Sequence, residues 1–81
     1  MEQQKEKRIE HIIDSKKSIM EYFIYSNNNW AHKLVLFEKK QEPILLYEYV
    51  EKEDSIKIFK DKSLDSYKTF FKENDILIRD F

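Results

Sequence analysis

Glycine and cysteine are both absent from this chain of 81 residues. Phosphate-cradling loops, dinucleotide-binding turns and nucleophile elbows need glycine where the backbone turns sharply or approaches a ligand closely, so these kinds of site are excluded. Without thiols the chain has no disulfide, no cysteine-based zinc site and no cysteine nucleophile. The sequence therefore narrows function mainly by exclusion.

A strong excess of one charge and long apolar runs are also missing. The 15 basic and 16 acidic residues give a net charge of −1, which argues against a protein that binds polyanions through bulk charge. The longest apolar runs, at 34–37 and 44–47, have four residues each and are too short to span a bilayer. The start of the chain lacks the apolar core of a signal peptide. We expect a cytoplasmic protein with no membrane segment.

The composition also indicates the kind of gene and the size of the fold. One Ala and two Arg stand against thirteen Lys and ten Ile, as in an AT-rich gene of a low-GC bacterium, a phage or another mobile element. We expect residues 1–81 to form a single small domain, which buries only about 60–65 % of its unfolded surface. A partner or a second copy that covers apolar surface would stabilise such a domain.

The pattern of apolar residues predicts the elements. From about residue 4 to 25 they recur at steps of three and four, which predicts an amphipathic helix, and Asn27, Asn28 and Asn29 fit its C-cap because Asn tolerates the left-handed conformation. Runs rich in β-formers at about 30–38, 43–50 and 55–60 predict strands. Ser63 as N-cap predicts a helix over about 63–73, followed by a short edge strand within 76–81.

Four-residue hairpin loops then predict the register of the three strands. The sequence therefore indicates an α+β fold of order α-β-β-β-α, built on a three-stranded antiparallel meander with a short C-terminal edge strand. Its core face would read Leu34, Tyr47 and Ile58 with Leu36, Leu45, Tyr49 and Ile56, and its opposite face would read Lys33, Glu48 and Lys57 beside Val35, Leu46 and Phe59, with Phe37 and Ile44 adjoining.

The apolar residues of the opposite face are the main functional prediction. Two helices cover one side of such a sheet, so a contiguous apolar patch on the other side is typical of an interaction site. Trp30, which follows the three asparagines, is expected to be a partly exposed anchor. The predicted protein interface consists of Trp30, Val35, Phe37, Ile44, Leu46 and Phe59. Two other interpretations remain open here: that the first helix lies across this face, or that the register is shifted by one residue.

Other candidate residues point to weaker hypotheses. His11, Asp14 and His32 lack a recognised ligand spacing, so we expect structural or solvated histidines and no metal. Lysines cluster between residues 55 and 72, and four of them are candidates for binding nucleic acid: Lys60, Lys62, Lys68 and Lys72. No residues combine as nucleophile, base and orienting group, so we expect no catalytic site, no cofactor and no enzyme.

The sequence as a whole favours a non-enzymatic protein-binding module, an inhibitor or regulator of another macromolecule, which a phage or mobile element could encode. Its partner would bind the apolar strand face and the region of Trp30. A small nucleic-acid-binding domain that uses the lysine cluster is the first alternative. A homodimeric structural subunit, in which the same open face binds a second copy, is the second alternative.

Overall fold

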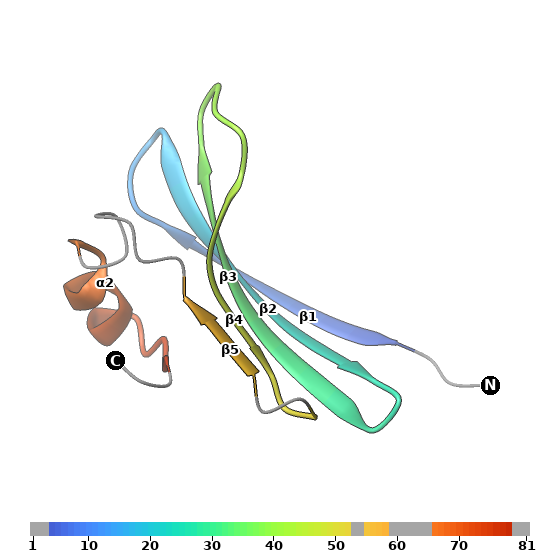
Figure 1. The fold of residues 1–81 in the computed structure, drawn as a ribbon. Helices are drawn as coiled ribbons and strands as arrows, with labels where there is room; N and C mark the ends of the chain where they lie inside the picture. Colours follow the sequence, from blue (N-terminus) through green and yellow to red (C-terminus); the bar gives the residue numbers. More distant parts are fainter. Residues whose placement is uncertain (1–3, 53–54, 59–65, 79–81) are drawn as a thin grey trace.

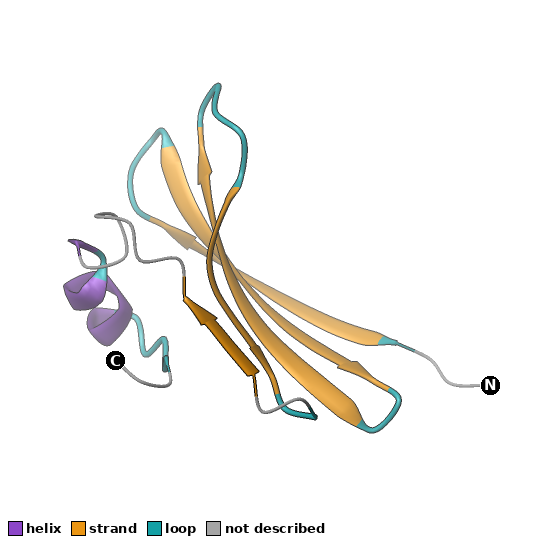
Figure 2. Ribbon diagram, viewed as in Figure 1, coloured by secondary structure: helices purple, strands orange, loops and turns teal. Residues whose placement is uncertain are grey.

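The protein is a twisted antiparallel β-sheet with one short helix against one of its faces (Figure 1). The computed structural model describes residues 4–52, 55–58 and 66–78, and for 55–58 it describes the backbone only. The strands lie in chain order, β1-β2-β3-β4-β5, so each is hydrogen-bonded to its neighbours in sequence (Figure 2). The elements are β1 (Lys5–Ile12), β2 (Lys17–Ser26), β3 (Asn29–Glu38), β4 (Ile44–Val50), β5 (Ser55–Ile58) and α2 (Lys68–Glu73).

The predicted helix over residues 4–25 is wrong, and the α-β-β-β-α order is wrong with it. This segment is the β1-β2 hairpin, and the described chain is mostly β. The reason is that β2 has apolar side chains on both faces: Ile19 and Phe23 lie on one, Met20 and Ile24 on the other. Adjacent apolar pairs at this spacing imitate the three- and four-residue steps of an amphipathic helix.

Two tight turns replace the helix and its cap. Asn27 and Asn28 form the two-residue loop between β2 and β3, with φ angles of 54° and 58°, as a type I′ hairpin turn requires. The left-handed conformation predicted for these asparagines is confirmed, although it serves a hairpin and not a helix end. In the β1-β2 loop, the Asp14 carboxylate accepts hydrogen bonds from the backbone N–H groups of Lys16 at 2.7 Å and Lys17 at 2.9 Å.

The three strands predicted at about 30–38, 43–50 and 55–60 are present as β3, β4 and β5, with 59–60 outside the described residues. The register is also confirmed in this part of the sheet. Leu34 pairs with Tyr47 and Lys33 with Glu48 across β3 and β4. On the other side of β4, Tyr47 pairs with Ile58, Glu48 with Lys57 and Val50 with Ser55.

Beyond Leu34 the predicted register fails because β4 contains a β-bulge. Val35 pairs with Leu45, not with Leu46, so Leu46 is an extra residue in β4. A bulge of this kind re-aims the side chains that follow it. Leu46 is 0 % exposed beside the buried Tyr47, and Ile44 packs against the same core. Leu45 and Leu46 have therefore exchanged the faces that the sequence predicted for them.

Helix α2 and the segment after it pack on one face of the sheet, which we call the covered face. The helix is shorter than the predicted 63–73, Ser63 lies outside the described residues, and 76–78 form no strand. Asp75 takes a φ of 55° and Ile76 N–H donates to Phe71 O at 2.8 Å, which is the Schellman helix end usually made with glycine. The buried core is Ile19, Leu34, Leu36, Leu46, Tyr47, Tyr49, Phe71 and Ile76.

The opposite side of the sheet, which we call the open face, is also rich in apolar side chains. None of its residues belongs to the buried core or packs against it among the described residues. On β2, β3 and β4 the apolar residues of the open face are Met20, Ile24, Ala31, Val35, Phe37, Leu45 and Val50, and its polar residues include Ser18, Tyr22, Lys33 and Glu48, all half-buried.

In the part of the chain that the structure describes, no helix is long and apolar enough to cross a membrane.

The β2-β3 turn gives a test of the hairpin. We expect Asn28→Val to lower the free energy of unfolding by about 1–2 kcal/mol, because a β-branched residue opposes a positive φ. Asn28→Gly should leave the stability unchanged or raise it slightly. Urea unfolding followed by circular dichroism measures both, with Gln41→Val in the β3-β4 loop as the control. A valine tolerated equally well at both positions would contradict the type I′ turn.

Candidate functional site

Glu21 is a charged residue in the middle of the covered face, and it is only 5 % exposed. Strand β2 places it there because it pairs with Ile9 on β1 and Leu34 on β3. A carboxylate in such surroundings destabilises the fold unless hydrogen-bond donors replace the lost water. The donors therefore define the site.

Two histidines supply these donors. His11 lies on β1 opposite Ile19, and His32 lies on β3 opposite Phe23, so each is a diagonal neighbour of Glu21, within reach for long side chains. The Nε2 atom of His11 is 3.0 Å from Glu21 Oε1, and the Nε2 atom of His32 is 2.7 Å from Oε2. One carboxylate thus bridges two imidazoles from two different strands.

The electrostatics of this cluster keep Glu21 ionised. Burial alone would raise the pKa of its carboxyl, but the hydrogen bonds from His32 and His11 and the charges of these rings outweigh burial and lower the pKa below the ordinary 4.5. Each ring presents Nε2–H to a carboxylate oxygen, and this fixes its orientation. The carboxylate of Glu21 therefore stays ionised at neutral pH.

Aromatic rings enclose the cluster. Phe23 stacks on the His32 ring with 4.7 Å between centroids and 15° between planes. Tyr47 meets the same imidazole edge-on at 5.4 Å. On the other side, Phe70 meets His11 edge-on at 6.4 Å. With Glu21 and His32 each only 5 % exposed, the hydrogen bonds lie in a medium of low polarity, which strengthens them.

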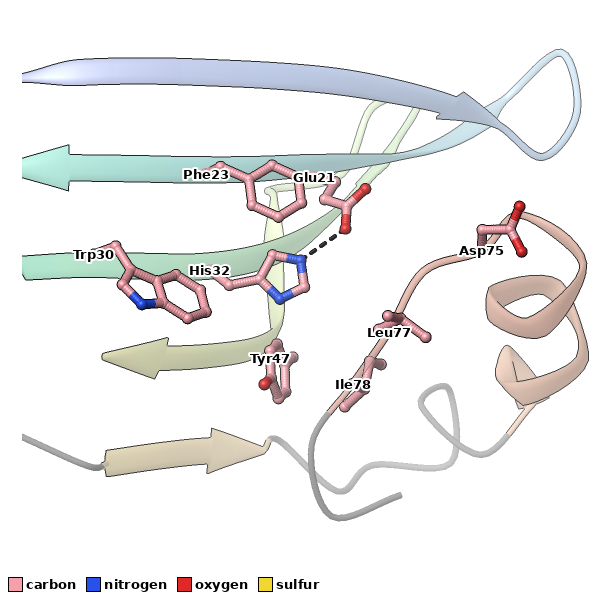
Figure 3. A pocket seen from close by; sticks show the side chains of 8 residues that line it. All are labelled: Glu21, Phe23, Trp30, His32, Tyr47, Asp75, Leu77 and Ile78. Atoms are coloured by element: carbon pink, nitrogen blue, oxygen red, sulfur yellow. Dashed lines mark hydrogen bonds and ion pairs between the residues drawn. The ribbon is translucent and has the colours of Figure 1, made fainter. Parts of the chain in front are cut away.

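A cavity of about 400 Å³ adjoins the cluster, between the covered face and the segment that follows α2. Figure 3 shows side chains from β2, β3 and β4 on one side and Leu77 and Ile78 on the other. Leu77 is 83 % exposed at its edge. The cavity is lined by Glu21, Phe23, Trp30, His32, Tyr47, Asp75, Leu77 and Ile78.

The described lining of the cavity combines carboxylate, aromatic and aliphatic side chains and contains no Ser, Thr, Cys or Lys. In the described part of the chain, no group of three or more His, Cys, Asp or Glu is arranged to hold a metal ion. The candidate set of His11, Asp14 and His32 is not assembled, because Asp14 caps the β1-β2 turn while both histidines bind Glu21.

The structure divides the predicted protein interface between two faces. Val35 and Phe37 are half-buried on the open face. Ile44 and Leu46 lie on the covered face as part of the core or against it, which corrects their predicted position, and the bulge is the cause. Trp30 is half-buried on the covered face and lines the cavity. Phe59 lies outside the described residues.

The candidate nucleic-acid lysines are only partly described. Lys68 and Lys72 are exposed at the two ends of one turn of α2, and Lys60 and Lys62 lie outside the described residues. The described residues therefore do not show Lys68 and Lys72 as part of a larger cluster of lysines.

Sequence reasoning missed the centre of the site. Glu21 is the single acidic residue within the mostly apolar run from Ile19 to Tyr25. An isolated charge in such a run was the signal in the sequence that could have indicated a buried carboxylate. Comparisons with family models, with curated proteins and with solved structures find no match to this chain. The site is therefore interpreted from its own geometry.

The lowered pKa of Glu21 predicts how stability depends on pH. The ionised carboxylate stabilises the fold fully above the ordinary pKa of 4.5, and this contribution is lost as the pH falls through the lowered value. We expect Glu21→Gln to reduce the free energy of unfolding by about 1–3 kcal/mol near neutral pH, because one histidine loses its acceptor. The difference from wild type should shrink in strong acid.

Urea unfolding of both proteins across this pH range measures the difference. Glu42→Gln, in the exposed β3-β4 loop, removes the same charge elsewhere and should cost little at any pH. A stability difference for Glu21→Gln that stays constant or grows in acid would show that the ionised carboxylate does not stabilise the fold.

Proposed function

We propose that this protein is a non-enzymatic protein-binding module that docks through its open sheet face, and that the partner is a second copy of the chain. The observation that carries the proposal is the apolar open face, which lies opposite the side covered by α2. A small domain that leaves such a face in water has a strong tendency to associate.

On β2, β3 and β4 the open face is apolar on both sides of a narrow polar row, and on β1 the two apolar rows end at Glu6 and Glu10. Across the strands, Met20, Val35 and Leu45 form one apolar row, and Ile24, Ala31 and Val50 form a second. Between them runs the polar row of Arg8, Tyr22, Lys33 and Glu48. Lys33 Nζ lies 3.5 Å from Glu48 Oε2, so part of the charge in this row is already compensated before any partner covers it.

The order of charges in the polar row supports a second copy as the partner. A two-fold axis parallel to the strands, between β2 and β3, would place β1 of one copy over β4 of the other. Arg8 would then face Glu48, and Tyr22 would face Lys33, in both directions. The same rotation brings Met20 over Val35 and Ile24 over Ala31, so apolar surface meets apolar surface at the centre, while Glu10 and Glu6 come over Leu45 and Val50 at the edges. Such self-complementarity is what a two-fold interface requires.

The proposal predicts a concentration-dependent dimer that depends on Val35. We expect wild type to dimerise, and Val35→Lys to weaken self-association by at least about tenfold, because the dimer would bury an unpaired ammonium. Analytical ultracentrifugation measures the association. Gln41→Lys, which adds the same charge to an exposed loop, should dimerise as wild type does. Thermal unfolding confirms that each variant folds.

A charge exchange tests the orientation of the copies. Arg8→Glu should weaken the dimer, and the double variant Arg8→Glu with Glu48→Arg should restore part of the loss. A wild-type chain that remains monomeric up to about 0.5 mM, where even weak specific dimers are detected, would contradict the proposal. So would a dimer that Val35→Lys leaves unchanged.

A further inference from the structure

We infer that the cavity on the covered face is a binding site for a small organic cation of the methylated ammonium class. The inference is independent of the open face, because the cavity lies on the opposite side of the sheet. It rests on three properties of the lining: its charge, its aromatic rings and its size.

Two carboxylates belong to the described lining of the cavity. Glu21 is ionised, and Asp75 adds a second carboxylate at the exposed side. No lysine or arginine is among the described residues that line the cavity. The rings of His11 and His32 bind Glu21 on the side of the sheet and share its single carboxylate between them. The carboxylates of Glu21 and Asp75 are the groups of the described lining that would attract a cation.

The aromatic lining selects the kind of cation. Phe23, Trp30 and Tyr47 come from three different strands and line the same space (Figure 3). The face of an aromatic ring attracts a cation through its quadrupole, most strongly for tryptophan, and quaternary ammonium groups are recognised in this way. Apolar contacts from Leu77 and Ile78 suit the methyl groups of such a cation.

The hydrogen bonds already made by Glu21 argue against other cations. Both of its oxygens accept an imidazole N–H, so few acceptor positions remain. A primary ammonium has three donors to satisfy, and Mg²⁺ or Ca²⁺ needs six or more oxygen ligands. A methylated ammonium needs no hydrogen bond and gives up its hydration more easily. The volume of about 400 Å³ lies near the lower end for ligand pockets, as a small ligand requires.

Choline is the probe, and its neutral carbon analogue, with tert-butyl in place of trimethylammonium, is the matched control ligand. Trp30 is the only tryptophan of the chain, so its fluorescence reports directly on the cavity. We expect a saturable fluorescence change with choline, at a dissociation constant on the order of 1 mM or lower. The neutral analogue should bind at least about tenfold more weakly. Isothermal titration calorimetry provides a second readout.

Two variants assign the effect to the cavity. Glu21→Gln keeps the shape of the side chain and should weaken choline binding at least about tenfold. Asp75→Asn changes an exposed carboxylate of the lining and should weaken choline binding by a smaller factor. If Glu21→Gln does not fold, the affinity of Asp75→Asn for choline shows whether a carboxylate of the cavity contributes to binding. Glu42→Gln is the matched control and should bind as wild type does. Val35→Lys should also bind choline normally, which separates this site from the proposed dimer.

Three results would overturn the inference. These are no saturable binding of choline to wild type, equal binding of the neutral analogue, and unchanged affinity in a folded Glu21→Gln variant. Equal binding of the analogue would identify the cavity as an apolar pocket without preference for charge. None of these results would bear on self-association through the open face.

Discussion

The buried carboxylate of Glu21 is the interaction on which the covered face depends. It lies on the middle strand of the first three, and its hydrogen bonds reach His11 on β1 and His32 on β3. Every alternative position of these strands would leave a buried charge without donors, which is far more costly than the loss of one apolar contact. The cluster therefore specifies the register of β1, β2 and β3 where apolar packing alone would tolerate a shift.

Each segment of the fold was predictable to the extent that apolar and polar residues alternate along it. The segments of β3, β4 and β5 were predicted because strand-forming runs alternate with short polar loops, and pairing Val50 with Ser55 gave the observed register. The β1-β2 hairpin was not predicted, because a sheet with apolar residues on both faces loses the period of two that marks a strand. For the same reason Asp14, which forms one turn, was assigned to a helix, and Asn27, which forms the other, was assigned to the C-cap of that helix.

The site was less predictable than the fold because it depends on two registers at once. His11 and His32 are ten and eleven residues from Glu21, and nothing in those spacings indicates a contact. They meet only because the β1-β2 and β2-β3 pairings place each histidine diagonally next to the carboxylate. Trp30 was predicted to be a partly exposed anchor, and it is half-buried beside the cavity. Trp30 lies on the covered face because the two-residue turn at Asn27 and Asn28 sets the pairing of β2 with β3. The sequence prediction missed this turn because it assigned the asparagines to the end of a helix.

The bulge in β4 connects the two surfaces of the molecule. Because Leu46 is an extra residue, it and Tyr47 are both buried on the covered face, and Tyr47 reaches the edge of His32. The same extra residue turns Leu45 to the open face, where it extends the row that contains Met20 and Val35. Without the bulge, Leu46 would occupy that position and the core would lose a fully buried side chain. A single inserted residue thus supplies the core and completes the apolar surface opposite it, so neither face can be changed at β4 without affecting the other.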